Sequence, residues 1–169
     1  MNIAVVYKSR YGAAKRYAQW IAEDLKCPIY NLSEVKPGQL DNCGAVVYGG
    51  GVYAGSVSGL KDAFSLFNKD LVVFAVGMAK PTEASAAAFK DKLIPAEVKD
   101  RTALFQLRGG YDLGKMSFFH KLVMMLVRGV MKKGESSPGE REKFKNKIVD
   151  FIDRSSLKPL VDYIKKTYK

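Results

Sequence analysis

The chain has 169 residues, of which 47% are hydrophobic, and this length and composition suit one folded domain and exclude a disordered chain. Its formal net charge of +11 favours an anionic partner, but it carries no helix-turn-helix, RNA-recognition or zinc-finger pattern, so we expect no nucleic acid as partner. The first residues lead into a strand pattern without a charged leader, and Cys27 and Cys43 lack metal-ligand spacing. We therefore expect a reduced, cytoplasmic protein without a metal site.

Apolar runs alternate with amphipathic patterns along the first two thirds of the chain. The runs predict strands at residues 3–7, 28–32, 45–48, 71–76 and 102–107, and the amphipathic segments predict helices at 13–25, 59–67 and 82–93. Continuous runs of Val, Ile and Phe are typical of strands covered on both faces, and single helices between them imply right-handed crossovers. The sequence therefore predicts an α/β fold, a doubly wound parallel sheet of five strands.

A short loop of hydroxyl and small residues follows the first predicted strand and leads directly into the first helix. Such a loop presents free backbone N–H groups and the positive end of a helix to one point, which favours a bound phosphate. The candidate phosphate ligands are Ser9, Arg10, Tyr11, Gly12, Ala13 and Ala14.

Three further loops are expected at the same edge of the sheet, because ligands of doubly wound sheets bind beyond the carboxyl ends of the strands. These loops are residues 49–55, 77–82 and 108–111, and each contains glycine, which allows backbone to approach a flat ligand closely.

Other phosphate-binding families do not match these residues. No Gly-Lys-Ser/Thr of a Walker loop is present, and the first loop lacks the G-x-G-x-x-G of a dinucleotide fold. Asn31 stands where that fold places an acid. A receiver domain needs acids at the ends of the first and third strands, where this chain has Lys8 and Gly49.

Residues 1–116 resemble the flavodoxins in the order of their strands, in the first loop and in the glycine-rich loop after the third strand. The resemblance implies that FMN is the cofactor and that residues 9–14 hold its phosphate. It also implies that the flavin ring lies between two sets of residues: Gly51, Val52, Tyr53, Ala54 and Gly55 on one side, and Gly77, Met78 and Ala79 on the other.

Two features depart from the flavodoxin pattern. Ala14 stands where a threonine often adds a hydroxyl, so we expect weaker FMN binding, by about 1–3 kcal/mol for one hydrogen bond to a charged group. The carriers that this domain resembles are usually acidic, whereas this chain is basic. A different role on the same scaffold is therefore expected.

The remaining residues, 117–169, are predicted to form a basic helical extension of a single domain spanning residues 1–169. They hold 13 basic and 6 acidic residues. The segment from Phe118 to Met131 reads as a helix with a broad apolar arc and a cationic stripe, too short to span a membrane. It is interpreted as a peripheral membrane contact, a cover over the active site or the last core helix.

Two further helices are predicted in this extension. A capping box at residues 137–140 should open the first of them, with Phe144, Ile148, Phe151 and Ile152 facing inward. The second covers residues 157–168, with Leu160, Val161 and Ile164 on one side.

A closer resemblance rests on Leu107-Arg108, on Phe118-Phe119-His120-Lys121 with the helix that follows, and on Gly134-Glu135. These residues look like those of the flavodoxin-type, menaquinone-dependent protoporphyrinogen dehydrogenases. The resemblance implies an oxidoreductase that passes electrons from an apolar, anionic substrate through FMN to a quinone. Basic side chains suited to bind the substrate's propionates are Arg108, Lys115, Lys121 and Arg128.

No residue is a convincing general acid or base, and His120 is interpreted as a surface or capping residue. Two alternatives remain open at this point. One is a small soluble electron carrier that docks on a redox partner protein. The other is an interaction module that has lost FMN, for which Ala14 is the direct support. The sequence leaves the oligomeric state open.

Overall fold

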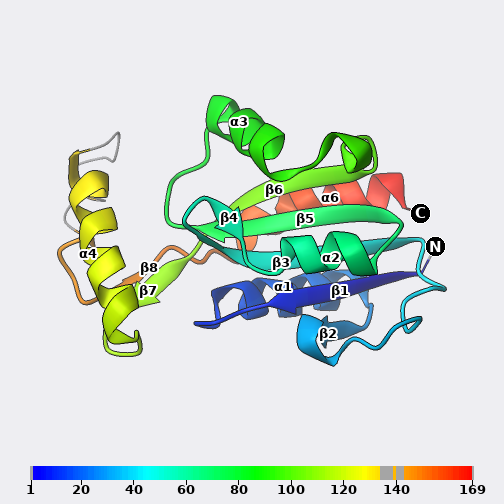
Figure 1. Cartoon of the computed structure of the whole chain (residues 1–169), viewed down its shortest axis with the longest axis horizontal. Helices are drawn as coiled ribbons and strands as arrows, with labels where there is room; N and C mark the ends of the chain where they lie inside the picture. The colour runs from blue at the N-terminus through cyan, green and yellow to red at the C-terminus, as the bar shows by residue number, and fades with distance from the viewer. Residues whose placement is uncertain (1, 134–138, 140–142, 169) are drawn as a thin grey trace. The chain divides into compact units, whose positions relative to one another are not determined.

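The computed structural model describes residues 2–133, 139 and 143–168, and its chain divides into two compact units. The first unit comprises residues 1–109 and 152–169, and the second comprises residues 110–151. Each unit is described by itself below (Figure 1).

A parallel sheet with the strand order β2-β1-β3-β5-β6 forms the centre of the first unit, which confirms the predicted doubly wound fold. The short β4 pairs antiparallel with β3. The strands are β1 (Ile3–Lys8), β2 (Ile29–Asn31), β3 (Ala45–Tyr53), β4 (Ser56–Val57), β5 (Asp70–Gly77) and β6 (Thr102–Arg108). The α-helices are α1 (Ala13–Leu25), α2 (Leu60–Leu66), α3 (Glu83–Leu93) and α6 (Lys158–Thr167), and short 3-10 turns cover Leu32–Glu34, Ala96–Val98 and Arg154–Leu157.

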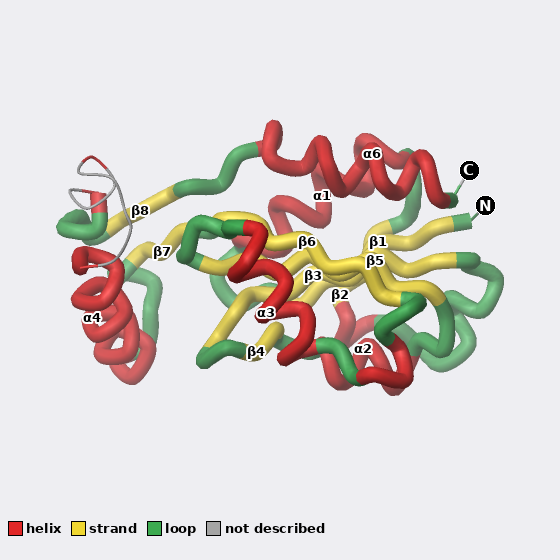
Figure 2. The backbone as a smooth tube through the Cα atoms, turned by 90° about the horizontal axis from the view of Figure 1, so that it is seen from above, coloured by secondary structure: helices red, strands yellow, loops and turns green. Residues whose placement is uncertain are grey.

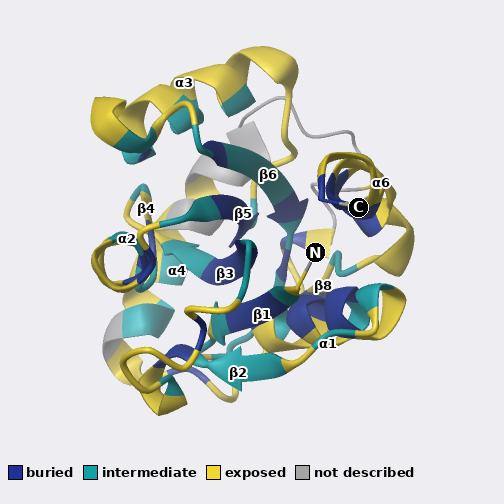
Figure 3. Ribbon diagram, turned by 90° about the vertical axis from the view of Figure 1, so that its right-hand side faces the viewer, coloured by how far each residue is buried: buried dark blue, intermediate teal, exposed yellow. Residues whose placement is uncertain are grey.

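Two apolar layers cover the two faces of this sheet because successive strand residues point to opposite sides. Val5 and Val47 belong to the cluster under α1 and α6, whereas Val6 and Val46 belong to the cluster under α2. Figure 2 shows α1 and α6 on one face and α2 and α3 on the other. Most residues of the central strands β3 and β5 are buried (Figure 3). Their continuous apolar runs are thus explained by burial on both faces.

The last helix, α6, belongs to the first unit, whereas the sequence assigned it to the basic helical extension of residues 117–169. Leu160, Val161 and Ile164 are buried in the same cluster as Tyr17 and Ile21 of α1, as the apolar spacing predicted. The division after residue 116 therefore does not coincide with the boundaries of the two units. The single domain of residues 1–169 stays a prediction.

The second unit contains β7 (Gly110–Asp112), α4 (Phe118–Lys133) and β8 (Ile148–Asp150). β7 and β8 form an antiparallel ribbon in which Tyr111 pairs with Val149. The buried Tyr111, Met116, Phe144 and Val149 form the interior of this unit.

The prediction of a helix with an inward-facing Ile148 is wrong over residues 148–152. Residues 148–150 form a strand, and the side chain of Ile148 is exposed. Close packing on β7 explains the strand, since a Cβ at Gly110 would lie 2.4 Å from the carbonyl oxygen of Val149. Of the predicted capping box at residues 137–140, Ser137, Pro138 and Glu140 lie outside the described residues.

None of the helices in the described part of the chain has the length and apolar content needed to cross a membrane.

Candidate functional site

The carboxyl ends of four neighbouring strands bring the predicted loops to one edge of the sheet. Lys8 of β1 pairs with Gly50 of β3, Gly51 of β3 with Val76 of β5, and Gly77 of β5 with Arg108 of β6. Because these pairs lie at the ends of the strands, the segments that follow them share one rim, as the sequence predicted.

The first loop turns sharply into α1 at Gly12. This residue has φ of +93°, and its N–H donates to Ser9 Oγ at 3.1 Å. A Cβ added at Gly12 would meet no atom within 4 Å, so the space outside the loop is open. The N–H groups of Ala13, Ala14 and Lys15 precede the first intrahelical hydrogen bond of α1, from the Arg16 N–H to the Gly12 carbonyl oxygen, so the helix itself offers them no acceptor. The geometry fits a phosphate held by backbone N–H groups.

Only the backbone of Ala14 is placed to contact such a ligand. Its side chain is buried in the cluster between α1 and the sheet, beside Val5 and Tyr17. The alanine therefore contributes an N–H group at the second position of the helix, while its methyl group fills the core.

The residues predicted as a glycine-rich loop after the third strand form a β-hairpin instead. β3 continues to Tyr53, and Val52 pairs with Val57 of β4. The turn at its tip is Ala54-Gly55, with φ values of 48° and 75°, a two-residue turn of the kind that closes hairpins.

Two glycines of this strand are required by packing rather than by a ligand. A Cβ at Gly49 would lie 1.8 Å from Phe74 Cζ, and one at Gly50 would lie 2.6 Å from the carbonyl oxygen of Ser58. Glycine therefore appears here without breaking the strand, which is why the prediction of a loop from residue 49 was wrong.

Backbone and small side chains connect the rim segments to one another. Gly109 donates its N–H to the carbonyl oxygen of Gly77 at 2.7 Å. A Cβ at Gly109 would lie 3.8 Å from the Ala13 methyl, and a Cβ at Gly77 would lie 3.6 Å from Val52. The starts of α1, the β3 hairpin, the loop after β5 and the end of β6 are thus neighbours.

Charge and aromatic groups join the first loop to the tip of the hairpin. The Arg10 guanidinium lies 5.9 Å from the centre of the Tyr11 ring. Burial raises the pKa of Tyr53, the neighbouring Tyr11 raises it further and Arg10 opposes both. Arg10, Tyr11 and Tyr53 therefore occupy one region of the rim.

The predicted substrate-binding residues lie in both units. Arg108 ends β6 in the first unit. Lys115 and Lys121 belong to the second unit, where Lys115 Nζ lies 3.8 Å from Asp112 Oδ2. The side chain of Arg128 is outside the described part of the structure. Substrate binding by these four residues stays a prediction.

His120 lies in the first turn of α4, where its Nδ1 shares a hydrogen bond of 2.7 Å with Ser117 Oγ.

Sequence reasoning missed two residues that shape the rim. A Cβ at Gly55 would lie 2.8 Å from the Lys92 ammonium, so α3 contributes a cation beside the hairpin tip. Tyr17 donates to the carbonyl oxygen of Arg108 at 2.8 Å. The spacing of Tyr17 predicted only a core position, and Lys92 looked like an ordinary surface lysine, so neither carried a signal of its tertiary partner.

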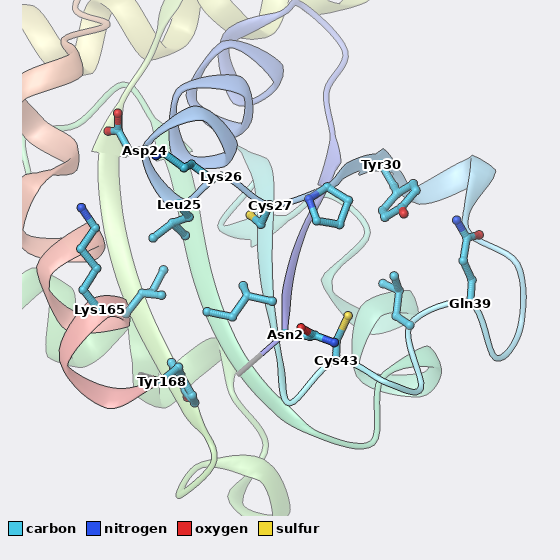
Figure 4. A pocket seen from close by; sticks show the side chains of 14 residues that line it. Asn2, Asp24, Leu25, Lys26, Cys27, Tyr30, Gln39, Cys43, Lys165 and Tyr168 are labelled. Carbon is cyan, nitrogen blue, oxygen red and sulfur yellow. The ribbon is translucent and has the colours of Figure 1, made fainter.

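A separate pocket of about 550 Å³ lies at the opposite, amino-terminal edge of the sheet (Figure 4). Asn2, Cys27, Cys43 and Tyr168 line it, together with the end of α1. Burial, followed by the nearby Cys43, raises the pKa of Cys27 to about 11. The pocket contains none of the predicted site residues. Within the described residues, no group of three or more His, Cys, Asp or Glu side chains could hold a metal ion.

A family model described as a flavodoxin domain matches residues 4–138 of the chain. A curated relative, an uncharacterized protein of Methanocaldococcus jannaschii, is 30% identical over an alignment of 80 residues, and the match covers 44% of this chain and 53% of that protein. The chain thus spans about half the length of the curated relative that it matches.

Solved structures show more distant likenesses. A flavodoxin from the domain Archaea is 16% identical, with 63% of this chain and 85% of that chain covered and a TM-score of 0.43. Oxidised flavodoxin 2 from Bacillus cereus is 16% identical, with 64% and 86% covered and a TM-score of 0.45. The rubredoxin oxygen:oxidoreductase from Desulfovibrio gigas is 9% identical, with 98% and 36% covered and a TM-score of 0.44. Likenesses this distant carry no argument about function.

The family model covers well over half of the chain, and the backbone N–H groups at the start of α1 fit a phosphate. The chain therefore belongs to the flavodoxin domain family, with FMN as its cofactor.

Proposed function

We propose that the protein is an FMN oxidoreductase related to the protoporphyrinogen dehydrogenases, which takes electrons from an apolar, anionic substrate and delivers them to a quinone. FMN, when bound, supplies the redox chemistry by accepting an electron pair from the substrate and passing it to the acceptor. The observation that carries the proposal is a flavodoxin rim in a chain with a net charge of +11.

The role proposed for the first loop is to hold the FMN phosphate. Ser9, Arg10, Tyr11 and Gly12 lie around the start of α1, and the N–H groups of Ala13 and Ala14 add two donors at the positive end of the helix. Arg10 is exposed and carries a positive charge at the same loop, which adds attraction for the phosphate.

The role proposed for the other rim segments is to confine the flavin ring. Gly51–Gly55 would lie along one side and Gly77–Ala79 along the other, since Val52 already approaches Gly77. The half-buried Met78 offers an apolar, adaptable surface to such a ring.

The role proposed for the basic residues is to bind the carboxylates of the substrate. Arg108 follows directly on the rim, and Lys115, Lys121 and Arg128 lie further along the chain. Charge-assisted hydrogen bonds from such groups orient an anion without contributing a proton to the reaction. The substrate's electrons and protons then leave together with the reduced quinone.

The test is anaerobic oxidation of protoporphyrinogen by the FMN-loaded protein with a menaquinone analogue, followed by porphyrin fluorescence. The proposal predicts turnover above that of the same concentration of free FMN. Lys121→Gln should raise KM, and Lys61→Gln, an exposed lysine on α2, should leave it unchanged. Turnover no faster than that of free FMN would reject the proposal.

A second candidate function is a small electron carrier, which the family itself supports. It predicts reduction by a flavodoxin reductase at a rate that falls with salt, because docking on an acidic partner would depend on surface charge. The third alternative, an interaction module without FMN, predicts no change in the absorption spectrum of FMN on addition of the protein.

A further inference from the structure

Helix α4 presents a stripe of large apolar side chains to solvent. Phe118, Leu122, Met125 and Leu126 are exposed, with Phe118 at 86% and Leu126 at 69%. Their spacing of four, three and one residues places them on a single face of the helix. These four residues are called the α4 apolar stripe below.

Exposure of this kind is unusual for an amphipathic helix of a globular protein. Such helices normally turn their apolar face inward, whereas here the half-buried residues of α4 include His120 and Lys121. Contiguous exposed apolar surface of this type marks a site of interaction with another molecule or with a membrane.

The charge around the stripe indicates which kind of partner it fits. Residues 113–134 contain five basic residues and no acidic one: Lys115, Lys121, Arg128, Lys132 and Lys133. A second copy of the chain would bring the same cations face to face, and like charges oppose such a contact. A partner with an apolar interior beneath a negatively charged surface can contact both the α4 apolar stripe and these basic residues. An anionic lipid bilayer has this character.

The length of α4 indicates how it would lie. Its 16 residues extend over about 24 Å, shorter than the ~30 Å of a hydrocarbon core. A helix of this length with one apolar face lies along the interface, with its apolar side chains among the upper acyl chains and its cations at the headgroups.

We propose that α4 docks the protein on the surface of an anionic lipid bilayer, with the α4 apolar stripe inserted into the interface. The inference goes beyond the proposed redox function and does not depend on it, because the docking requires neither the substrate nor the quinone.

The experiment is flotation of the FMN-loaded full chain with vesicles of phosphatidylcholine and phosphatidylglycerol, compared with vesicles of phosphatidylcholine alone. The wild type should bind the anionic vesicles, and less of it should bind as salt rises. Leu126→Glu should weaken this binding about tenfold or more, since it removes one large apolar group and adds a negative charge. Leu66→Glu is the matched control, because Leu66 is a 47% exposed leucine on α2 of the first unit. Its binding should equal that of the wild type.

A spectroscopic measurement complements flotation. Phe118→Trp introduces an indole into the stripe, and its emission should shift to shorter wavelength on addition of anionic vesicles. The emission of Trp20, which is present in both proteins, is subtracted by comparison with the wild type.

Several results would overturn the proposal. One is equal vesicle binding by the wild type and Leu126→Glu. Another is a wild type that does not bind anionic vesicles and is a dimer, together with a Leu126→Glu variant that is a monomer. The α4 apolar stripe would then bind a second copy of the chain. A third is a loss of thermal stability and FMN affinity in Leu126→Glu without vesicle binding by the wild type, since the stripe would then cover the protein's own first unit.

Discussion

The buried hydroxyl of Tyr17 on α1 donates a hydrogen bond of 2.8 Å to the carbonyl oxygen of Arg108 at the end of β6. The hydroxyl oxygen of Tyr17 itself accepts a hydrogen bond of 3.0 Å from the N–H of Asp153. The chain leaves the first unit after Gly109 and returns to it at Ile152. Within the first unit, one side chain thus connects the end of β6 and the segment that begins at Ile152 to the helix that begins at the candidate phosphate site.

Tyr17→Phe is predicted to lower the free energy of unfolding by about 2–4 kcal/mol, because it leaves two backbone groups without their partner. Urea denaturation measures this change. Hydrogen exchange at the Asp153 amide should accelerate as well, since its acceptor is removed.

Tyr48→Phe is the matched comparison for this prediction. Tyr48 is equally buried but donates a single hydrogen bond of 2.6 Å, to the carbonyl oxygen of Ser58. Its loss should cost about 1–2 kcal/mol. A Tyr17→Phe protein as stable as the wild type would show that the two hydrogen bonds of the Tyr17 hydroxyl do not stabilise the fold.

Gly12→Ala is predicted to lower the free energy of unfolding by about 1–2 kcal/mol, since an L-residue with a Cβ is strained at its φ of +93°. The added Cβ meets no atom within 4 Å, so the effect comes from the backbone alone. The shifted loop should also bind FMN about tenfold more weakly if one hydrogen bond to the phosphate is lost. Fluorescence titration of the apoprotein with FMN measures this affinity.

Gly38→Ala is the matched control for Gly12→Ala, because it introduces similar backbone strain at a position away from the candidate phosphate site. Gly38 has φ of +78°, and its added Cβ would be in ordinary contact, 3.5 Å from Asp41 Oδ2. The variant should lose stability to a similar extent and keep the FMN affinity of the wild type. Equal FMN affinities for Gly12→Ala and the wild type would place the phosphate elsewhere.

Cys27 is predicted to remain a thiol in mildly alkaline solution. Burial, with Cys43 as the second cause, raises its pKa from 9.0 to about 11. The folded protein therefore keeps a proton that the unfolded chain releases, and the free energy of unfolding should fall as pH rises between these two values.

Labelling with iodoacetamide, followed by peptide mass spectrometry, measures the titration of Cys27. The midpoint should lie near 11 in the native protein and near 9.0 in urea. A native midpoint close to that of the unfolded chain would contradict the burial of this thiol.

Two of the central strands, β1 and β5, could be predicted to within about two residues because their signal is local. The apolar run at residues 71–76 became β5 (Asp70–Gly77), and the run at residues 3–7 became β1 (Ile3–Lys8). Strands buried on both faces consist of such runs, and no knowledge of their neighbours is needed to find them. The turn from β1 into α1 is equally local, so the first loop of the site was predicted from adjacent residues.

Elements that depend on distant partners could not be predicted in the same way. β8 has only three residues, and it exists because Gly110 allows close pairing with β7, some forty positions earlier in the sequence. The glycines at residues 49 and 50 indicated a loop, but they are explained by Phe74 and Ser58. The bond from Tyr17 to Arg108 likewise joins residues that no periodic pattern relates.

Calorimetric titration of the apoprotein with FMN and, separately, with riboflavin tests most directly whether the N–H groups at the start of α1 hold a phosphate. The account predicts saturable binding of FMN at one site and binding of riboflavin that is at least about tenfold weaker, because riboflavin lacks the phosphate. Absence of FMN binding, or equal affinity for the two compounds, would contradict it.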